Sequence, residues 1–350
     1  MLRNFLILGF LSTLFGCGDG KPGLFSASGY HVAKDKVWYK TSAGMSYNVT
    51  EVLGADPKTF EEHQLSSKVF EGTTAFYGMD KNSVFWTDNK IEGADLATFE
   101  YLCSQYSKDK NVVYYMAGPL THDLAHFAVI SQDFVKDNRA VYFGGDVFSE
   151  DPAHFARVGE DGSEYWKDSQ KCWYSVYELK GVDPAVFRYL GPKTATDGTR
   201  IYHEMNEVEG ADGKTYQILE QGYSKDAQRV YLKSRVIAGA DPASFRVLGD
   251  DYSVDKKYCY YFATPLPDAD PATFQVINEF YSKDARRVFT LDKLIEGADP
   301  ATFRVLNGSA GCSCDAHYAY TMEKRIVGVD PKIFPAKGEC KSCNESGVTF

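Results

Sequence analysis

Four cysteines near the C-terminal end have the spacing that most strongly suggests chemistry in this 350-residue chain. They form a Cys-x-Cys pair and a Cys-x-x-Cys pair, with 25 residues between the two pairs. Four thiolates at this spacing suit a tetrahedral zinc site, but disulfides are the expected state in an exported protein, and we favour them. Four cysteines allow three pairings, and the spacing does not choose among them. The four residues are Cys312, Cys314, Cys340 and Cys343.

The N-terminal residues indicate export and lipid attachment. A short positive start is followed by an apolar run over residues 5–15, which is too short to span a membrane and is typical of a secretory signal over 1–16. The run ends in Leu14-Phe15-Gly16-Cys17, which resembles the lipobox of bacterial lipoproteins, although Phe15 is atypical there. The resemblance implies that Cys17 becomes an acylated N-terminus carrying palmitate-type chains; the alternative is an ordinary signal with an incidental cysteine. Gly18 resembles an outer-membrane address, so we expect a lipid-anchored protein of the bacterial cell envelope, in the outer membrane if the organism has one.

Two further groups of side chains could hold metal ions. His122, His126 and His154 fall in or near one column of consecutive repeats and could approach one another around a divalent cation. Asp80 and Asp109 lie in calcium-like turns, but these lack the twelve-residue loop and the closing glutamate. Most such groups are solvated side chains, turn formers and caps. We therefore predict no metal site.

Composition and motifs assign no catalytic residue and no cofactor. The chain contains no Gly-x-Ser-x-Gly elbow, phosphate-binding loop or His-Glu-x-x-His motif. Acidic residues exceed basic ones by 48 to 38, and no run of five basic residues occurs, so nucleic acid is not expected as a partner. An acidic surface can attract cations or basic proteins, although it more often serves solubility.

Two series of aspartates recur along the chain at a nearly fixed interval. The first series, the turn aspartates, steps by 29 residues from Asp168 to Asp284, and the second, the cap aspartates, does so from Asp183 to Asp299. An aromatic residue follows each cap aspartate four residues later. A fixed period of about 20 to 50 residues indicates stacked supersecondary units. The turn aspartates are Asp35, Asp80, Asp109, Asp137, Asp168, Asp197, Asp226, Asp255, Asp284 and Asp315; the cap aspartates are Asp56, Asp95, Asp123, Asp151, Asp183, Asp212, Asp241, Asp270, Asp299 and Asp330.

Each repeat is expected to combine short strands with one helical turn. Asp241 can cap a turn that has Pro at its first position, and Phe245 ends that turn as a buried staple. Strands are predicted over 245–248, 230–232 and 236–238, and a polar turn is predicted at Tyr-Ser-Lys-Asp (223–226), directly before the strand at 230–232. Cys172 and Cys259 occupy the column where other repeats carry valine, so these two cysteines and Cys103 are predicted to be small core residues.

The repeats resemble a known family. Lys108-Asp109-Lys110-Asn111, followed by Val112-Val113-Tyr114-Tyr115, looks like the signature of the DKNYY repeat family of bacterial proteins. The resemblance covers about 30–335, with departures such as Gly118-Pro119-Leu120 before Asp123 and Asp212-Gly213 without the proline. It implies a repeat architecture and no established activity.

These observations predict a mainly β fold made of about ten tandem repeats in an open, solenoid-like array; the alternative is a closed, propeller-like ring. The expected organisation is a signal peptide (1–16), a lipidated cysteine with a flexible tether (17–29), a repeat array (30–335) and a cysteine-containing tail (336–350). An insertion over 61–79 is expected to be a loop packed over the end of the array. For function we expect a membrane-anchored binding or scaffold protein with an envelope protein or glycan as partner. The alternatives are a carboxylate-based envelope enzyme and a purely structural component.

Overall fold

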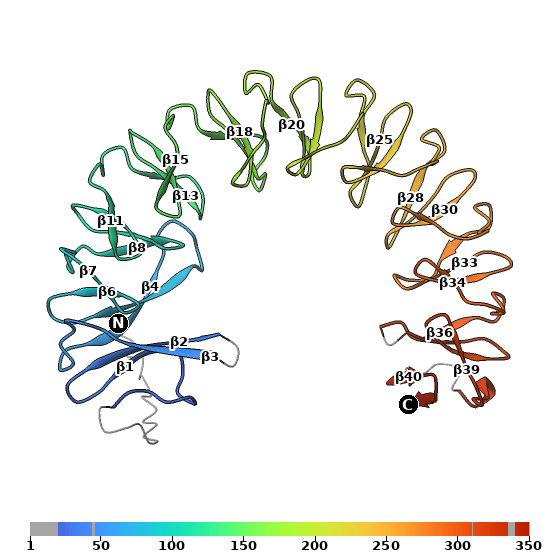
Figure 1. Ribbon diagram of the computed structural model, residues 1–350, viewed down its shortest axis with the longest axis horizontal. Coiled ribbons are helices and arrows are strands. Elements are labelled where there is room, and N and C mark those ends of the chain that lie inside the picture. The colour runs from blue at the N-terminus through green and yellow to red at the C-terminus, as the bar shows by residue number, and fades with distance from the viewer. Residues whose placement is uncertain (1–19, 44–45, 310, 335–339, 350) are drawn as a thin grey trace, which may run out of the picture. The chain divides into compact units, whose positions relative to one another are not determined.

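The computed structural model describes residues 20–43, 46–309, 311–334 and 340–349 of the chain, and these residues are almost entirely β-structure. They form two compact units, Met1–Phe155 and Ala156–Phe350, each built of small antiparallel sheets that follow one another along the chain (Figure 1). Nine of the sheets in the described residues have four strands. In the part of the chain that the structure describes, no helix combines the length and the apolar character needed to cross a membrane.

The first unit contains a three-stranded sheet followed by three four-stranded sheets, and every strand pairs with its neighbour in sequence. The strands, in chain order and grouped by sheet, are β1 (Gly29–Val32), β2 (Val37–Ala43) and β3 (Ser46–Glu51); β4 (Glu61–Ser66), β5 (Thr74–Met79), β6 (Val84–Trp86) and β7 (Asn89–Ile91); β8 (Glu100–Cys103), β9 (Tyr106–Lys108), β10 (Val113–Tyr115) and β11 (Gly118–Thr121); β12 (Ala128–Val129), β13 (Phe134–Lys136), β14 (Val141–Phe143) and β15 (Asp146–Ser149).

The second unit continues the pattern with six four-stranded sheets and a final hairpin. Its elements are β16 (Ala156–Arg157), β17 (Tyr165–Lys167), β18 (Cys172–Tyr174) and β19 (Tyr177–Glu178); β20 (Arg188–Gly191), β21 (Thr194–Thr196), β22 (Ile201–His203) and β23 (Asn206–Glu207); β24 (Gln217–Ile218), β25 (Tyr223–Lys225), β26 (Val230–Leu232) and β27 (Arg235–Val236); β28 (Arg246–Gly249), β29 (Tyr252–Val254), β30 (Cys259–Tyr261) and β31 (Thr264–Pro265); β32 (Gln275–Val276), β33 (Tyr281–Lys283), β34 (Val288–Thr290) and β35 (Lys293–Leu294); β36 (Arg304–Asn307), β37 (Cys312–Cys314), β38 (Ala319–Thr321) and β39 (Lys324–Ile326); the 3-10 helix η1 (Pro331–Ile333); and the hairpin β40 (Ser342–Asn344) with β41 (Gly347–Thr349).

Each four-stranded sheet is a meander with two edge strands, so none of them closes into a barrel. The predicted mainly β fold of tandem repeats is thereby confirmed. One part of the repeat was predicted wrongly: Tyr-Ser-Lys at 223–225 is the second strand, β25, and not a polar turn. The reason is that Tyr223 enters the core with 1% of its surface exposed, while Lys225 Nζ reaches the Pro242 carbonyl oxygen at 2.8 Å. The turn itself begins only at Asp226.

The linker between successive sheets contains the predicted capped turn. The N–H groups of Ser244 and Phe245 donate to the Asp241 carbonyl oxygen at 3.2 and 3.0 Å, which makes a single turn of chain. Phe245 then packs between Tyr223 of one sheet and Tyr260 of the next, with ring centroids 5.6 and 6.0 Å away. This buried aromatic, 5% exposed, therefore joins two adjacent sheets through one hydrophobic core. Of the described residues, only Pro331–Ile333 form a 3-10 helix, and no α-helix occurs among them.

The segment over 61–79 also differs from the prediction of a covering loop. Most of it belongs to β4 and β5, two long paired strands that open the second sheet, with Glu61 opposite Met79 and Ser66 opposite Thr74. It is therefore a lengthened version of the first two strands of an ordinary repeat. The alternation in Glu-Glu-His-Gln-Leu-Ser, with Leu65 joining the core, is the local pattern that produces it.

The hairpin between the third and fourth strands contains a residue with a positive φ angle in successive repeats. Its first loop residue has a left-handed conformation, as at Lys233 with φ of 57°, and its N–H donates to the Gly222 carbonyl oxygen at 2.7 Å. Non-glycine residues adopt this conformation at a cost. In the sheet that ends at β15 the same position carries Gly144 and Gly145, which adopt it freely. The equivalent non-glycine residues are Thr87, Met116, Ser175, Glu204, Phe262, Leu291 and Met322.

Candidate functional site

The turn aspartates are the most heavily hydrogen-bonded side chains of the repeat. Asp226 is 4% exposed, and its Oδ1 accepts from the N–H groups of Gln228 and Arg229, each at 2.7 Å. Its Oδ2 accepts from the Tyr231 hydroxyl at 2.6 Å and from the N–H of the preceding cap aspartate, Asp212, at 3.0 Å. One buried carboxylate thus closes its own turn and fixes the linker that enters the sheet.

The surroundings of Asp226 shift its pKa and that of its tyrosine partner. Burial by itself raises the pKa of Asp226, but the hydrogen bonds from Tyr231 and from three backbone N–H groups outweigh it and hold the pKa below its ordinary value. Burial and the hydrogen bond to the carboxylate raise the pKa of Tyr231 to about 12. The same tyrosine–aspartate pair recurs as Tyr114–Asp109, Tyr142–Asp137, Tyr202–Asp197, Tyr260–Asp255 and Tyr320–Asp315.

A hydroxyl substitutes for the backbone donor where the linker is one residue shorter. The Gly-Ala pair is missing before the cap residue Asp123, and the Thr121 hydroxyl donates to Asp137 Oδ2 at 2.7 Å. The N–H of the cap residue Asp123 donates in turn to Thr121 Oγ1 at 3.1 Å. The repeat therefore preserves the link to its buried carboxylate through a side-chain relay.

Several of the residues considered for metal binding are engaged within their own repeats. His126 Nδ1 lies 2.8 Å from its cap carboxylate, Asp123 Oδ1, and His154 Nδ1 lies 2.8 Å from Asp151 Oδ1. Asp109 uses its Oδ1 for two backbone N–H groups, at 2.7 and 2.9 Å. Over the described residues, no group of three or more histidine, cysteine or acidic side chains is placed to hold a metal ion. Asp109 therefore acts as a turn residue, and His126 and His154 pair with cap aspartates.

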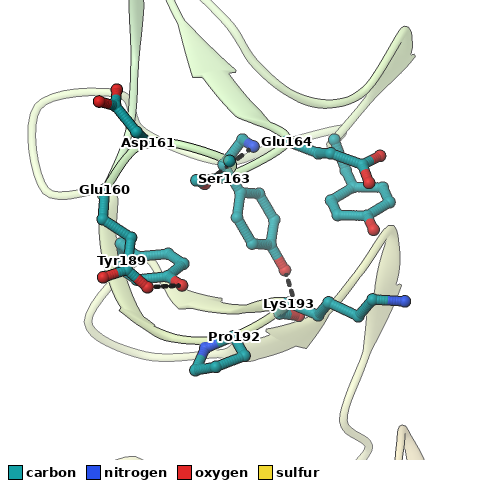
Figure 2. A pocket seen from close by; sticks show the side chains of 10 residues that line it. Glu160, Asp161, Ser163, Glu164, Tyr189, Pro192 and Lys193 are labelled. Atoms are coloured by element: carbon teal, nitrogen blue, oxygen red, sulfur yellow. Dashed lines mark hydrogen bonds between the residues drawn. The ribbon is translucent and has the colours of Figure 1, made fainter.

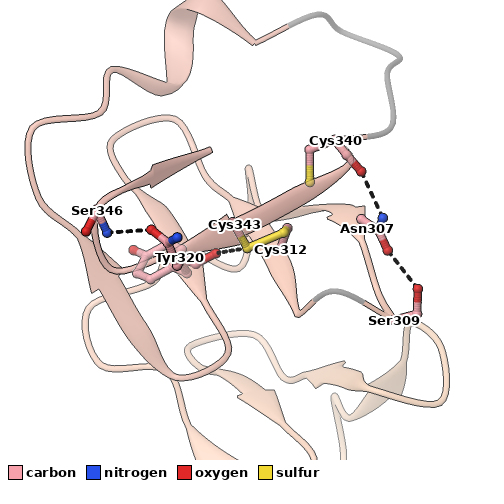
Figure 3. The surroundings of a disulfide bond; sticks show 8 residues. Asn307, Ser309, Cys312, Tyr320, Cys340, Cys343 and Ser346 are labelled. Atoms are coloured by element: carbon pink, nitrogen blue, oxygen red, sulfur yellow. Dashed lines mark hydrogen bonds between the residues drawn. A yellow bond between two sulfur atoms is a disulfide. The ribbon is translucent and has the colours of Figure 1, made fainter. Parts of the chain in front are cut away.

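The C-terminal cysteines are brought together by the last sheet and the final hairpin. A disulfide joins Cys312 to Cys343, with Cα atoms 5.7 Å apart, and the Cys340 carbonyl oxygen accepts from Asn307 Nδ2 at 2.8 Å (Figure 3). The disulfide uses two of the four thiolates that a zinc site would need. Cys314 and Cys340 are buried as thiols in the same hydrophobic cluster, and burial raises the pKa of both. The predicted lipid-bearing Cys17 lies outside the described residues.

One loop departs from the repeat in the middle of the chain, where the sequence interpretation placed no site. The loop between β16 and β17 spans 158–164, three residues longer than the corresponding loop at 219–222. The signal is present in the sequence, because Asp137 and Asp168 are 31 residues apart where the regular step is 29.

The long loop is well ordered by its own hydrogen bonds. Ser163 Oγ donates to the Val158 carbonyl oxygen at 2.7 Å, and Ser163 N–H donates to the Glu160 carbonyl oxygen at 3.0 Å. Gly159 has a φ of +107°, and a Cβ there would meet the Tyr189 ring at 2.6 Å. The loop therefore rests directly on the ring of Tyr189, a close approach that only glycine allows.

This loop and the following sheet enclose a pocket of about 230 Å³. Glu160 and Tyr189 lie together on one side, joined by a hydrogen bond of 3.0 Å from the tyrosine hydroxyl to Oε1, and Glu164 lies on the other side (Figure 2). The remaining lining residues are Asp161, Gly162, Ser163, Tyr165, Tyr174, Pro192 and Lys193.

The pocket carries three carboxylates beside aromatic rings. Among the residues that the structure describes, no ion pair engages Glu160, Asp161 or Glu164. Lys193 forms its ion pair with Glu204 Oε1, at 2.7 Å, and interacts with Glu164 only through the longer-range attraction of their charges. Carboxylates beside tyrosine rings form an environment that attracts cations by charge and by cation–π interaction.

The tyrosines of the pocket are kept neutral. Burial, followed by the charges of Glu164 and Glu204, raises the pKa of Tyr174. Burial and the hydrogen bond to Glu160 raise the pKa of Tyr189. The rings therefore present uncharged faces and hydroxyl groups to a ligand, while the negative charge of the lining comes from the three carboxylates.

Comparison with known proteins identifies a family but no individual relative. The model of the DKNYY family matches residues 30–177 and 195–324, most of the chain. Neither the curated proteins nor the solved structures gave a match to this chain.

Proposed function

Because this chain belongs to the DKNYY family and its repeats enclose an acidic, tyrosine-lined pocket, we propose that it is a binding protein of the bacterial cell envelope. The protein is anchored in the membrane by lipid on Cys17, in the outer membrane where the organism has one. Its ligand carries a primary ammonium group, which enters the pocket between the long loop 158–164 and the following sheet.

The observation that carries the ligand class is the set of three carboxylates without an ion pair. Other carboxylates in the described part of the second unit also lack an ion pair, but these three line one pocket together with tyrosine rings. An ammonium ion at the pocket would gain charge compensation from Glu160 or Glu164 and a ring face from Tyr189. A primary ammonium occurs on lysine side chains and on amino sugars, and both are available in a cell envelope.

Two observations support the envelope location. The lipobox-like ending of the signal sequence places Cys17 directly after a small residue. The Cys312–Cys343 disulfide is typical of proteins that fold in an oxidising compartment. Cys17→Ser is expected to abolish labelling by a fatty-acid analogue, and continued labelling of that variant would contradict the proposed anchor.

Calorimetric titration of the lipid-free protein tests the ligand class. Tetralysine and a glucosamine tetramer serve as probes, and their N-acetylated forms serve as controls that lack the charge. Binding of the free amines, weakening as salt is raised, supports the proposal; equal binding of free and acetylated forms contradicts it. Preference for one probe over the other identifies the source of the ammonium.

Two triple variants with the same change in charge test whether amine binding depends on the carboxylates of the pocket. The triple variant Glu160→Gln, Asp161→Asn, Glu164→Gln is expected to weaken amine binding at least tenfold, or about 1.4 kcal/mol. The control variant Glu279→Gln, Asp292→Asn, Glu296→Gln removes the same charge from exposed positions away from the pocket and is expected to bind as wild type. Equal loss of amine affinity in both variants would show that binding depends on the net charge of the protein and not on this pocket.

A second candidate function is favoured by the same carboxylates. Acidic side chains on opposite sides of a pocket can serve hydrolysis by acid–base catalysis, so the protein can be a carboxylate-based envelope hydrolase. Cleavage of the glucosamine tetramer during the titration, lost in the triple variant, would replace the binding function by this one.

A further inference from the structure

The described chain begins with a turn that exposes two large apolar side chains. Leu24 and Phe25 are 55% and 97% exposed, and they form the tip of a turn between Gly23 and Ser26. The turn is closed by the N–H and the hydroxyl of Ser26, which donate to the Gly23 carbonyl oxygen at 3.2 and 2.8 Å. This segment falls in the predicted flexible tether, yet from Gly23 it has a defined structure.

A buried lysine holds the turn in place. Lys40 of β2 is 1% exposed, and its Nζ donates to the carbonyl oxygens of Gly23, Leu24 and Ser26 at 2.8, 3.0 and 2.6 Å. The ammonium also lies 4.8 Å from the centre of the Tyr47 ring. Burial of a lysine is unfavourable unless its donors are satisfied, and here all three are used on the backbone on both sides of Phe25. The apolar tip is therefore presented on a rigid support.

We propose that Leu24 and Phe25 insert into the lipid surface to which the protein is anchored. This inference rests on the proposed anchor at Cys17, which precedes Phe25 by eight residues. Eight residues span at most about 28 Å, so the tip lies within reach of the leaflet that would hold the lipid. An apolar tip held beside the lipid adds buried apolar surface to the acyl chains on Cys17 and so strengthens the attachment.

Spin labelling of the full acylated protein in phosphatidylethanolamine–phosphatidylglycerol vesicles tests the insertion. Phe25→Cys carries the label, and Leu53→Cys, at a 71% exposed position of the same unit, is the control. The native free cysteines are buried and are expected not to react; they are Cys103, Cys172, Cys259, Cys314 and Cys340. We expect the label at position 25 to be accessible to oxygen in the acyl region and shielded from a water-soluble nickel complex, and the label at position 53 to show the reverse. A label at position 25 in water, on protein that remains bound to vesicles, overturns the proposal.

A second variant separates this proposal from the anchor itself. Phe25→Asp leaves Cys17 and its lipid intact and is expected to leave the vesicles at least tenfold faster than wild type, whereas Leu53→Asp should behave as wild type. Unchanged release of Phe25→Asp contradicts the insertion alone and leaves the anchor standing. Absence of acyl chains from the wild-type protein contradicts the proposed anchor, and the insertion with it.

Discussion

Asp226→Asn tests whether the buried turn aspartates hold the repeats together. The amide keeps the size of the side chain but has one acceptor oxygen where the carboxylate has two. Four donors converge on Asp226, three of them backbone N–H groups. The Tyr231 hydroxyl can rotate and accept from the new NH2 group, but the N–H of Asp212 then has no acceptor.

The cost follows from these contacts. Hydrogen bonds to a charged group contribute about 1.5–3 kcal/mol each and neutral ones about half of that, and a buried N–H without a partner costs about 1–3 kcal/mol. We therefore expect Asp226→Asn to lower the free energy of opening this repeat by about 3–4 kcal/mol. Tyr231→Phe removes one donor and is expected to cost only about 1–1.5 kcal/mol.

Hydrogen exchange followed by mass spectrometry measures the effect locally. A loss of about 3 kcal/mol speeds exchange by more than a hundredfold in peptides that cover 212–231. The matched control is Asp212→Asn, the same chemical change at the neighbouring cap, where asparagine caps as well as aspartate and almost no loss is expected. Losses of equal size in the two variants, or below about 1 kcal/mol for Asp226→Asn, would refute the role of the buried carboxylate.

Four further perturbations test other parts of the structure. Thr121→Val breaks the relay to Asp137 and should cost about 2 kcal/mol of unfolding free energy by chemical denaturation; no loss would mean that the relay is dispensable. Lys233→Gly relieves the left-handed backbone and should add about 0.5–1 kcal/mol, so a loss of stability would contradict the assigned strain. The turn aspartates with lowered pKa stabilise the fold at pH above their unfolded value of 3.8, so melting temperature should fall as pH drops below that value through the folded pKa values, and a flat profile there would contradict this. Intact-mass analysis of exported protein should show two hydrogens missing, because Cys312 and Cys343 form a disulfide while Cys314 and Cys340 are buried thiols; stoichiometric zinc would overturn the assignment.

The sequence predicts the architecture well because the same local pattern recurs in successive repeats. The cap at Asp241 and the staple at Phe245 can be read from local chemistry alone, and both are present. The strand at 223–225 was missed because Tyr-Ser-Lys-Asp carries turn-forming residues at its end, and only the neighbouring sheet shows that Tyr223 is buried. Burial of the turn aspartates was missed for a similar reason, since one of their donors comes from a linker 14 residues away, as from Asp212 to Asp226.

The candidate pocket could be located from the sequence but not described by it. The 31-residue step from Asp137 to Asp168 marks the long loop. Which side chains that loop would meet depends on the next sheet, because Tyr189 and Lys193 reach the pocket from a different repeat. The repeat period gives the order of the repeats along the chain, but it does not show which side chains of different repeats are in contact.

The most direct test of the binding function is the location of the bound amine. Hydrogen exchange of the lipid-free protein, with and without tetralysine, should show protection confined to peptides that cover 158–175 and 186–194. The triple variant Glu160→Gln, Asp161→Asn, Glu164→Gln should lose that protection. Protection elsewhere in the second unit, or protection at these peptides that survives in the triple variant, would contradict the assignment of this pocket as the binding site.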